Sequence, residues 1–246
     1  MMPRGPRPPR DRESRSGART ASDPPPAGAA DRAYALTLTP VSRETLERLD
    51  RFVALLLTWQ RTTHLIAPST ILHLWTRHIA DSLQLLDMAP DARVWVDLGA
   101  GAGFPGLAIA CALAGRPGAR VHLIDSNRKK AAFLREAQHL TAVPASVHAM
   151  RIEEFAASFD GPADVVTARA VAPLKSLLDK CFPLLGKSGA MGLFPKGQNA
   201  ELELRDVRES PIMRAWTMNA TLVPSRTDPA GRVVLIRDVE RRKPTP

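Results

Sequence analysis

The chain has 246 residues, with 34 lysines and arginines against 25 acidic residues, so its formal net charge is +9. This excess of positive charge favours a polyanionic partner such as nucleic acid. The alternative is that the charge serves only to keep the protein soluble. The two cysteines, Cys111 and Cys181, form no CxxC pair. They give no disulfide framework, which predicts a cytoplasmic protein.

Several classes of protein are disfavoured by the motifs that the sequence lacks. It contains no His/Cys metal cluster, no HExxH and no phosphate-binding loop. The longest uncharged apolar run covers residues 104–114 and is too short to cross a membrane. We therefore expect neither a metalloenzyme nor a membrane protein.

The amino-terminal third divides into a tail and a helical layer. Residues 1–33 are rich in arginine, proline, serine and glycine, which predicts a disordered basic tail. Residues 34–90 predict a helical layer, in which Ser42 caps a helix that runs to Trp59 and a second helix spans about residues 70–86.

The second helix carries polar residues four positions apart. His78 and Ser82 share part of one face with Asp81, and Arg77 precedes Asp81 by one turn. This spacing allows two interpretations. The residues either form a polar cluster over a ligand site or are a solvated face with an Arg77–Asp81 ion pair, and periodicity alone favours the second.

A glycine-rich turn follows a short buried strand over residues 94–98. Gly101, Gly103 and Gly106 match the G-x-G-x-x-G pattern of dinucleotide sites, which would suit an NAD-dependent oxidoreductase. However, Asp97 stands directly before the turn, where it would repel a pyrophosphate and attract the sulfonium and ammonium of S-adenosylmethionine. The pattern therefore favours a methyltransferase, with the oxidoreductase as the alternative.

From residue 92 onward, predicted strands and helices alternate. Strands are expected over residues 120–124, 145–150, 163–168 and 190–194, followed by an antiparallel pair over residues 220–223 and 232–237. This pattern predicts an α/β fold of the Rossmann-like class I methyltransferase type. Its doubly wound, mostly parallel sheet would have an antiparallel closing strand.

Candidate ligand contacts follow the expected carboxyl ends of the strands. Asp125 suits the ribose hydroxyls or a helix N-cap, and Ile152 and Glu153 suit a purine ring and its amine. Arg169 and Lys196 end the next two strands and suit an RNA or cofactor contact. Each of these residues also has an ordinary surface or helix-start interpretation.

Several separated motifs together resemble one known family. They are Trp75-x-Arg-His-x-x-Asp-Ser-Leu83, Asp97-Leu-Gly-Ala-Gly-Ala-Gly-Phe-Pro-Gly106, Ile124-Asp-Ser126, the Arg128–Leu134 segment, Arg151-Ile-Glu-Glu154, Arg169-Ala170 and Lys196-Gly197. In this order they resemble the small-subunit (16S) ribosomal RNA guanine-N7 methyltransferases, the RsmG or glucose-inhibited division protein B family. The resemblance covers about residues 46–237.

The resemblance implies a methyltransferase core over residues 91–246 that binds S-adenosylmethionine through Gly99, Phe104, Ile152, Glu153 and Arg169. The glycine motif and the second-strand acid add Asp97, Gly101 and Asp125. The implied partner is 16S ribosomal RNA, within the small subunit or an assembly intermediate, and we expect a monomer. The family's Trp-Asn-x-x-x-Asn-Leu-Thr segment differs here, where Trp59-Gln-Arg-Thr-Thr-His-Leu-Ile66 lacks both asparagines and the threonine.

The implied reaction needs no general base. Guanine N7 carries a lone pair and no proton, so catalysis reduces to alignment and electrostatics. Because N7 must stay free, we predict a donor to O6 only, from Arg169 or Lys196. A basic RNA-binding assembly factor without catalysis remains the non-enzymatic alternative.

Overall fold

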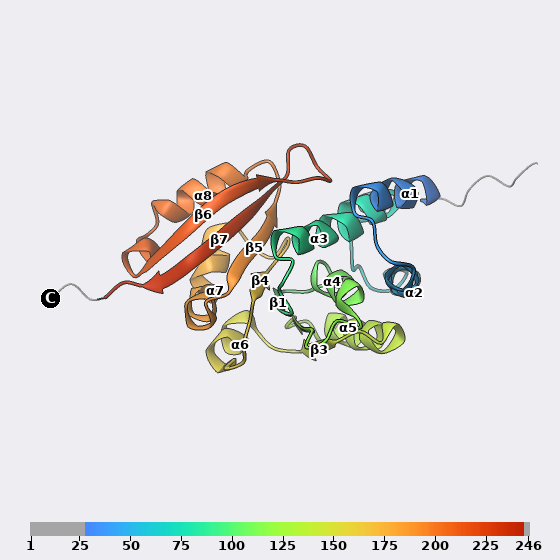
Figure 1. Cartoon of the computed structure of the whole chain (residues 1–246), viewed down its shortest axis with the longest axis horizontal. Helices are drawn as coiled ribbons and strands as arrows, with labels where there is room; N and C mark the ends of the chain where they lie inside the picture. Colours follow the sequence, from blue (N-terminus) through green and yellow to red (C-terminus); the bar gives the residue numbers. More distant parts are fainter. Residues whose placement is uncertain (1–27, 244–246) are drawn as a thin grey trace, which may run out of the picture.

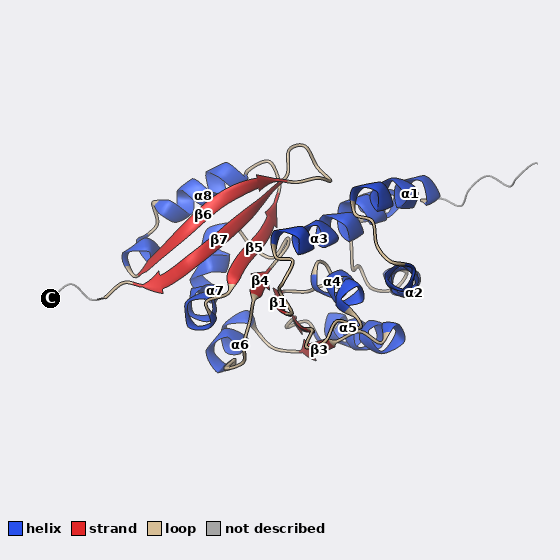
Figure 2. Cartoon of the chain, viewed as in Figure 1, coloured by secondary structure: helices blue, strands red, loops and turns tan. Residues whose placement is uncertain are grey.

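The computed structural model describes residues 28–243, which form a mixed sheet covered by helices on both faces (Figures 1 and 2). The strand order is β3-β2-β1-β4-β5-β7-β6. β1 to β5 are parallel, and β7 is antiparallel to both β5 and β6. The expected doubly wound sheet with an antiparallel closing element is confirmed.

The sheet and its covering helices follow the predicted order along the chain. The elements are β1 (Val94–Leu98), α4 (Gly106–Leu113), β2 (Arg120–Ile124), α5 (Arg128–Thr141), β3 (Ala145–His148), α6 (Ile152–Ser158), β4 (Val165–Thr167), α7 (Leu174–Ser188), β5 (Met191–Lys196), α8 (Ala200–Arg208), η4 (Pro211–Arg214), β6 (Trp216–Pro224) and β7 (Arg232–Arg241). The last two strands are longer than the sequence predicted, because they form a hairpin that pairs along its whole length.

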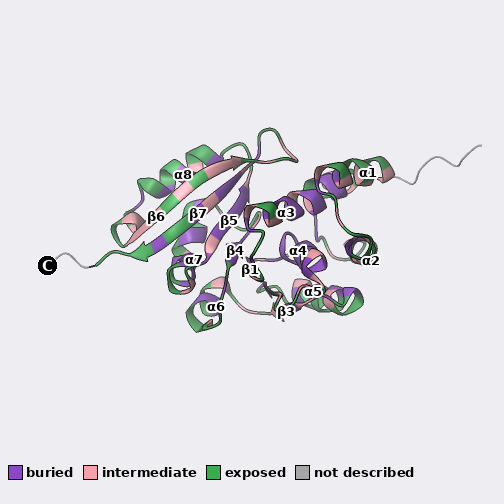
Figure 3. Ribbon diagram, viewed as in Figure 1, coloured by how far each residue is buried: buried purple, intermediate pink, exposed green. Residues whose placement is uncertain are grey.

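Neighbouring side chains of β1 point to opposite faces of the sheet and pack in two different hydrophobic cores. Trp95 packs with α2 (Arg43–Gln60), α4 and α5, whereas Val96 packs with α6 and α7. Both side chains are fully buried, as expected for a strand covered on both faces. Figure 3 shows the buried strands between helices whose outer faces are exposed.

The amino-terminal layer begins earlier than the tail composition predicted. α1 (Ala29–Leu38) is helical, so the boundary expected at residue 33 falls inside a helix. Asp31 accepts from the amides of Trp75 and Thr76 at 2.8 and 3.3 Å, and Arg32 makes a two-pronged ion pair with Asp50. Residues 1–27, which hold most of the expected tail, lie outside the described part of the chain.

The second predicted helix is a composite of four short segments. After α2 (Arg43–Gln60), the chain forms η1 (Pro68–His73), the π-helical η2 (Trp75–Ala80), α3 (Asp81–Leu83) and η3 (Gln84–Met88). Local π-helical geometry is often found at functional sites. Here it sets the spacing of the polar residues that the helix presents.

The altered segment that follows Trp59 is held in place by the side chain of Gln60. The Gln60 side chain accepts from the amides of Leu65 and Ile66 at 2.9 and 3.0 Å and donates to the Ile66 carbonyl at 2.8 Å. Trp59 donates to Glu136 on α5 at 3.0 Å. Gln60 thus closes this loop, and Trp59 connects the end of α2 to α5.

Candidate active site

The glycine turn between β1 and α4 has the backbone that the sequence predicted. Gly99, Gly101 and Gly103 have φ angles of +74°, +54° and +90°, a region that favours glycine. A side chain on Gly99 would have its Cβ 2.5 Å from Val171. The turn therefore requires glycine for both conformation and space.

Asp97 lies completely buried beneath this turn. Its Oδ2 accepts from the Gly106 amide at 2.8 Å, and burial raises its pKa to about 7. Its Oδ1 and the Thr167 hydroxyl each lack a partner among residues 28–243, and the two residues are opposite each other in the β1–β4 pairing. A buried carboxylate oxygen without a donor fits a cationic ligand group in the turn, such as the cofactor's ammonium or sulfonium.

Asp125 fixes the turn from the end of β2. Its two carboxylate oxygens accept from the Gly101 and Asn127 amides at 2.9 and 2.8 Å. The side chain that caps α5 is Asn127, which accepts from the first-turn amides of that helix, so the N-cap interpretation of Asp125 is wrong. Each Asp125 oxygen keeps a second lone pair that a ribose hydroxyl could use.

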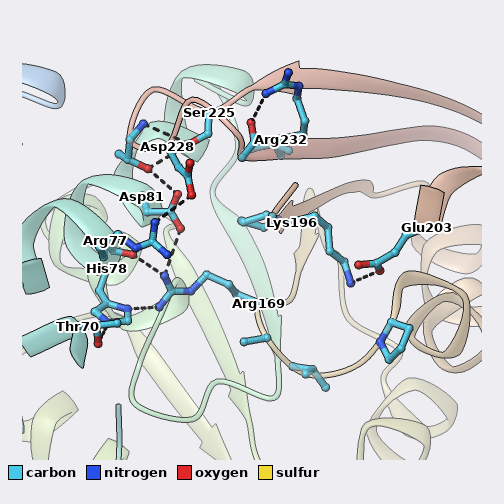
Figure 4. Close-up of a pocket in the computed structure, with 18 of the residues that line it drawn as sticks. Thr70, Arg77, His78, Asp81, Arg169, Lys196, Glu203, Ser225, Asp228 and Arg232 are labelled. Carbon is cyan, nitrogen blue, oxygen red and sulfur yellow. Dashed lines mark hydrogen bonds and ion pairs between the residues drawn. The ribbon is translucent and has the colours of Figure 1, made fainter. Parts of the chain in front are cut away.

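Arg169 joins the loop after β4 to the amino-terminal layer (Figure 4). Its guanidinium donates to the Arg77 carbonyl at 2.8 Å, to Asp81 at 3.2 Å and to Nδ1 of His78 at 2.6 Å. It also lies 5.5 Å from the ring of Phe104, within cation–π range. Arg169 therefore connects the glycine turn to the helix that the sequence left ambiguous.

The same network fixes the protonation of His78. Burial first, then the Arg169 charge, lowers the pKa of His78 to about 3, so the ring is neutral. Because a guanidinium only donates, Nδ1 must be the acceptor, and Nε2 carries the hydrogen that reaches Thr70 Oγ1 at 2.9 Å. The ring also stacks on Phe104, with centroids 5.0 Å apart.

The polar residues of the second helix form a cluster and not a solvated face. Arg77 pairs with Asp228 at 2.9 Å, whereas Asp81 pairs with Arg169. The intrahelical Arg77–Asp81 ion pair expected from periodicity is therefore wrong. The sequence predicted the hairpin turn but not the contacts that its Thr227 and Asp228 make with this helix, because those contacts join distant segments of the chain.

A pocket of about 570 Å³ opens between this helix, the loop after β4, the end of β5 and the β6–β7 turn. Its lining includes Arg77, Arg169, Lys196 and Arg232. Lys196 donates to the Ala172 carbonyl and to Oε2 of Glu203, both at 2.8 Å. The structure thus brings Arg169 and Lys196 to one pocket, at the carboxyl ends of adjacent strands.

Ile152 and Glu153 lie at the start of α6 and do not line this pocket. Ile152 is half-buried against the core under α6 and α7. Glu153 pairs with Lys180 of α7 at 2.6 Å, a bond that lowers the pKa of the carboxyl. Their expected contacts with adenine stay a prediction.

The sheet order and the acid-preceded glycine turn define the class I methyltransferase fold. Among solved structures, the chain is similar to an O-methyltransferase from Bacillus cereus in complex with SAH, at a TM-score of 0.55 and 14% identity over 85% of this chain and 97% of that chain. A putative O-methyltransferase from Klebsiella pneumoniae gives a TM-score of 0.53 at 14% identity, over 85% and 96%. At this identity, the likeness shows the fold alone.

Sequence comparisons narrow the class to one family. The model of the GidB family, rRNA small subunit methyltransferase G, matches residues 45–227. The chain is 56% identical to the ribosomal RNA small subunit methyltransferase G of Bradyrhizobium sp. (strain BTAi1) over 87% of this chain and 93% of the relative. The corresponding protein of Rhodopseudomonas palustris (strain BisB18) is 50% identical over 92% and 95%. The chain belongs to this family and is an S-adenosylmethionine-dependent methyltransferase.

Two expected absences can be compared with the described part of the chain. None of the helices in residues 28–243 is long and apolar enough to span a membrane. Within the same residues, no three His, Cys, Asp or Glu side chains are grouped so that they could hold a metal ion.

Proposed function

We propose that the protein transfers the methyl group of S-adenosylmethionine to N7 of a guanine in 16S ribosomal RNA. The supporting observation is the pocket beside the glycine turn, where Arg169 and Lys196 present donors and are paired with the carboxylates of Asp81 and Glu203. His78 is neutral and its Nδ1 accepts from Arg169. N7 methylation suits such a site because it needs no base.

The cofactor would supply an electrophilic methyl on a sulfonium. As the N7 lone pair forms the new C–N bond, the bond to sulfur breaks, and the positive charge passes to the purine ring. We propose that Asp97 attracts the cofactor's cationic groups, that Asp125 holds the ribose, and that Ile152 and Glu153 hold the adenine. The turn at Gly99, Gly101 and Phe104 allows the close approach.

Binding of the RNA substrate depends on the protein's charge and on access of the target base to the pocket. The net charge of +9 favours binding of RNA phosphates. The target base must be unstacked to enter this pocket. We propose that a monomer acts in the cytoplasm on the small subunit or its assembly intermediate.

The test is transfer of radiolabelled methyl from S-adenosylmethionine to small subunits, assembly intermediates and free ribosomal RNA from a strain that lacks the protein. Nucleoside analysis should find the label in 7-methylguanosine. Stable RNA binding without methyl transfer to any of these substrates would contradict the proposal and support the assembly-factor alternative.

A further inference from the structure

The end of the pocket opposite the Arg77–Asp228 pair holds a partly buried ion pair (Figure 4). Lys196 and Glu203 have side chains that are 10% and 25% exposed. Lys196 comes from β5 and Glu203 from the first turn of α8. Both line the same cavity.

Each partner keeps one hydrogen-bonding capacity unused by the described residues. Two of the three ammonium hydrogens of Lys196 are directed to the Ala172 carbonyl and Glu203. Oε2 of Glu203 accepts both from Lys196 and from the Leu174 amide, at 2.8 and 2.6 Å. Oε1 of Glu203 has no hydrogen bond to residues 28–243. One N–H donor and one carboxylate acceptor therefore stand side by side at the pocket.

This pairing matches one edge of guanine. Guanine presents the O6 acceptor next to the N1–H donor, so a lysine and a carboxylate in contact meet both groups. Adenine has the reverse pattern, with a donor at position 6 and an acceptor at N1. N7 lies on the far side of O6 from N1, so contacts to O6 and N1–H leave it free for methylation.

The charges also suit the reaction. Methylation at N7 makes the purine ring cationic, and the acidity of its N1–H rises. A carboxylate that accepts from N1–H therefore interacts more strongly with the methylated ring than with the neutral base, which lowers the barrier.

We infer that Glu203, together with Lys196, reads the O6 and N1–H groups of the target guanine. This inference rests on the proposed function. It assigns base selection to a carboxylate on α8 that neither the glycine motif nor the family motifs include. Glu203 is then a specificity-determining residue that touches the substrate.

The test compares Glu203→Gln with Glu201→Gln, an exposed glutamate two residues earlier on α8. Wild-type enzyme must first place label in 7-methylguanosine, and failure of that step contradicts the proposed function and not this assignment. Glu203→Gln should then lower kcat/KM about 10- to 100-fold, as for loss of a good base contact. S-adenosylmethionine binding by calorimetry should be unchanged, and Glu201→Gln should match wild type.

A second substrate separates base reading from a structural effect. Small subunits are reconstituted with 2-aminopurine, which keeps N7 but lacks O6 and N1–H, at the mapped position. Wild-type activity should fall sharply from guanine to 2-aminopurine, and the fall should be at least about fivefold smaller in Glu203→Gln, whose amide can donate to the bare N1. An equal fall in both proteins, or a Glu203→Gln kcat/KM within twofold of wild type, would overturn the assignment.

Discussion

The Arg169–Asp81 pair allows a quantitative test of the site's architecture. The two side chains are 17% and 16% exposed, so replacing Asp81 with alanine leaves a guanidinium buried without its carboxylate. Asp81 also accepts from Gln84 at 2.8 Å and Thr227 at 2.9 Å. Breaking a buried pair from one side costs about 3–5 kcal/mol. Since water still reaches one-sixth of each side chain, we expect about 2–4 kcal/mol.

The matched control is Asp228→Ala, which breaks the neighbouring Arg77–Asp228 pair. Those side chains are 52% and 32% exposed, and an ion pair this open contributes about 0–1 kcal/mol. Urea denaturation measures both free energies of unfolding. For a chain of this size, Asp81→Ala should also lower Tm by about 5–12 °C.

The direction of the stability change in a double variant tests whether the uncompensated charge is the cause. Adding Arg169→Met to Asp81→Ala removes the uncompensated charge, so the double variant should be more stable than Asp81→Ala alone. If Asp81→Ala costs no more than Asp228→Ala, or if Arg169→Met destabilises it further, the buried-charge reasoning is refuted.

Three further predictions follow from burial and backbone geometry. Asp97→Asn should weaken S-adenosylmethionine binding at least about tenfold at pH 8 yet stabilise the ligand-free protein. The pKa of Asp97 in the folded protein is raised from 3.8 to about 7, so its ionisation destabilises the ligand-free fold as pH rises through that range. Calorimetry at pH 6 and 8 should show the affinity for S-adenosylmethionine rising with pH in the wild type and not in Asp97→Asn. Burial lowers the pKa of His122 to about 4 and also lowers that of its partner His148. The free energy of unfolding of the wild type, measured in urea, should therefore fall as the pH falls from about 6.5 toward 4. In His122→Phe this fall should be smaller. Gly99→Ala should reduce methyl transfer at least about tenfold, whereas Gly118→Ala should not. Both glycines have φ near +75°, but the new Cβ would clash with Val171 at 2.5 Å at Gly99 and lie 3.7 Å from the Arg93 side chain, an ordinary contact, at Gly118.

The sequence predicted those parts of the fold whose signals are local. β1, its glycine turn and α4 are encoded within 20 consecutive residues, and each buried strand reads as a short apolar run. The positions of Arg169 and Lys196 at the ends of β4 and β5 follow from the same pattern. Their meeting in one pocket follows from the switch point of a doubly wound sheet.

The contacts that periodicity could not predict join distant segments. The helical spacing pointed Asp81 to Arg77, but the structure pairs it with Arg169, 88 residues away. Likewise, the composition of the flanking tail gave no sign of α1. This helix is held by hydrogen bonds between Asp31 and the backbone of η2 and between Arg32 and Asp50. Both cases are tertiary pairings that override the local preference.

The paired charges in the pocket indicate that the protein binds RNA phosphates and selects the target base at different surfaces. Three of its four cations, Arg77, Arg169 and Lys196, are each paired with a carboxylate, so the cavity offers directional donors and acceptors with little net charge. Such a cavity suits a neutral heterocycle and not a bare phosphate. The excess charge that would hold RNA must then act outside the pocket. The salt dependence of RNA binding should therefore be the same for Glu203→Gln and wild type, even though their base preference differs.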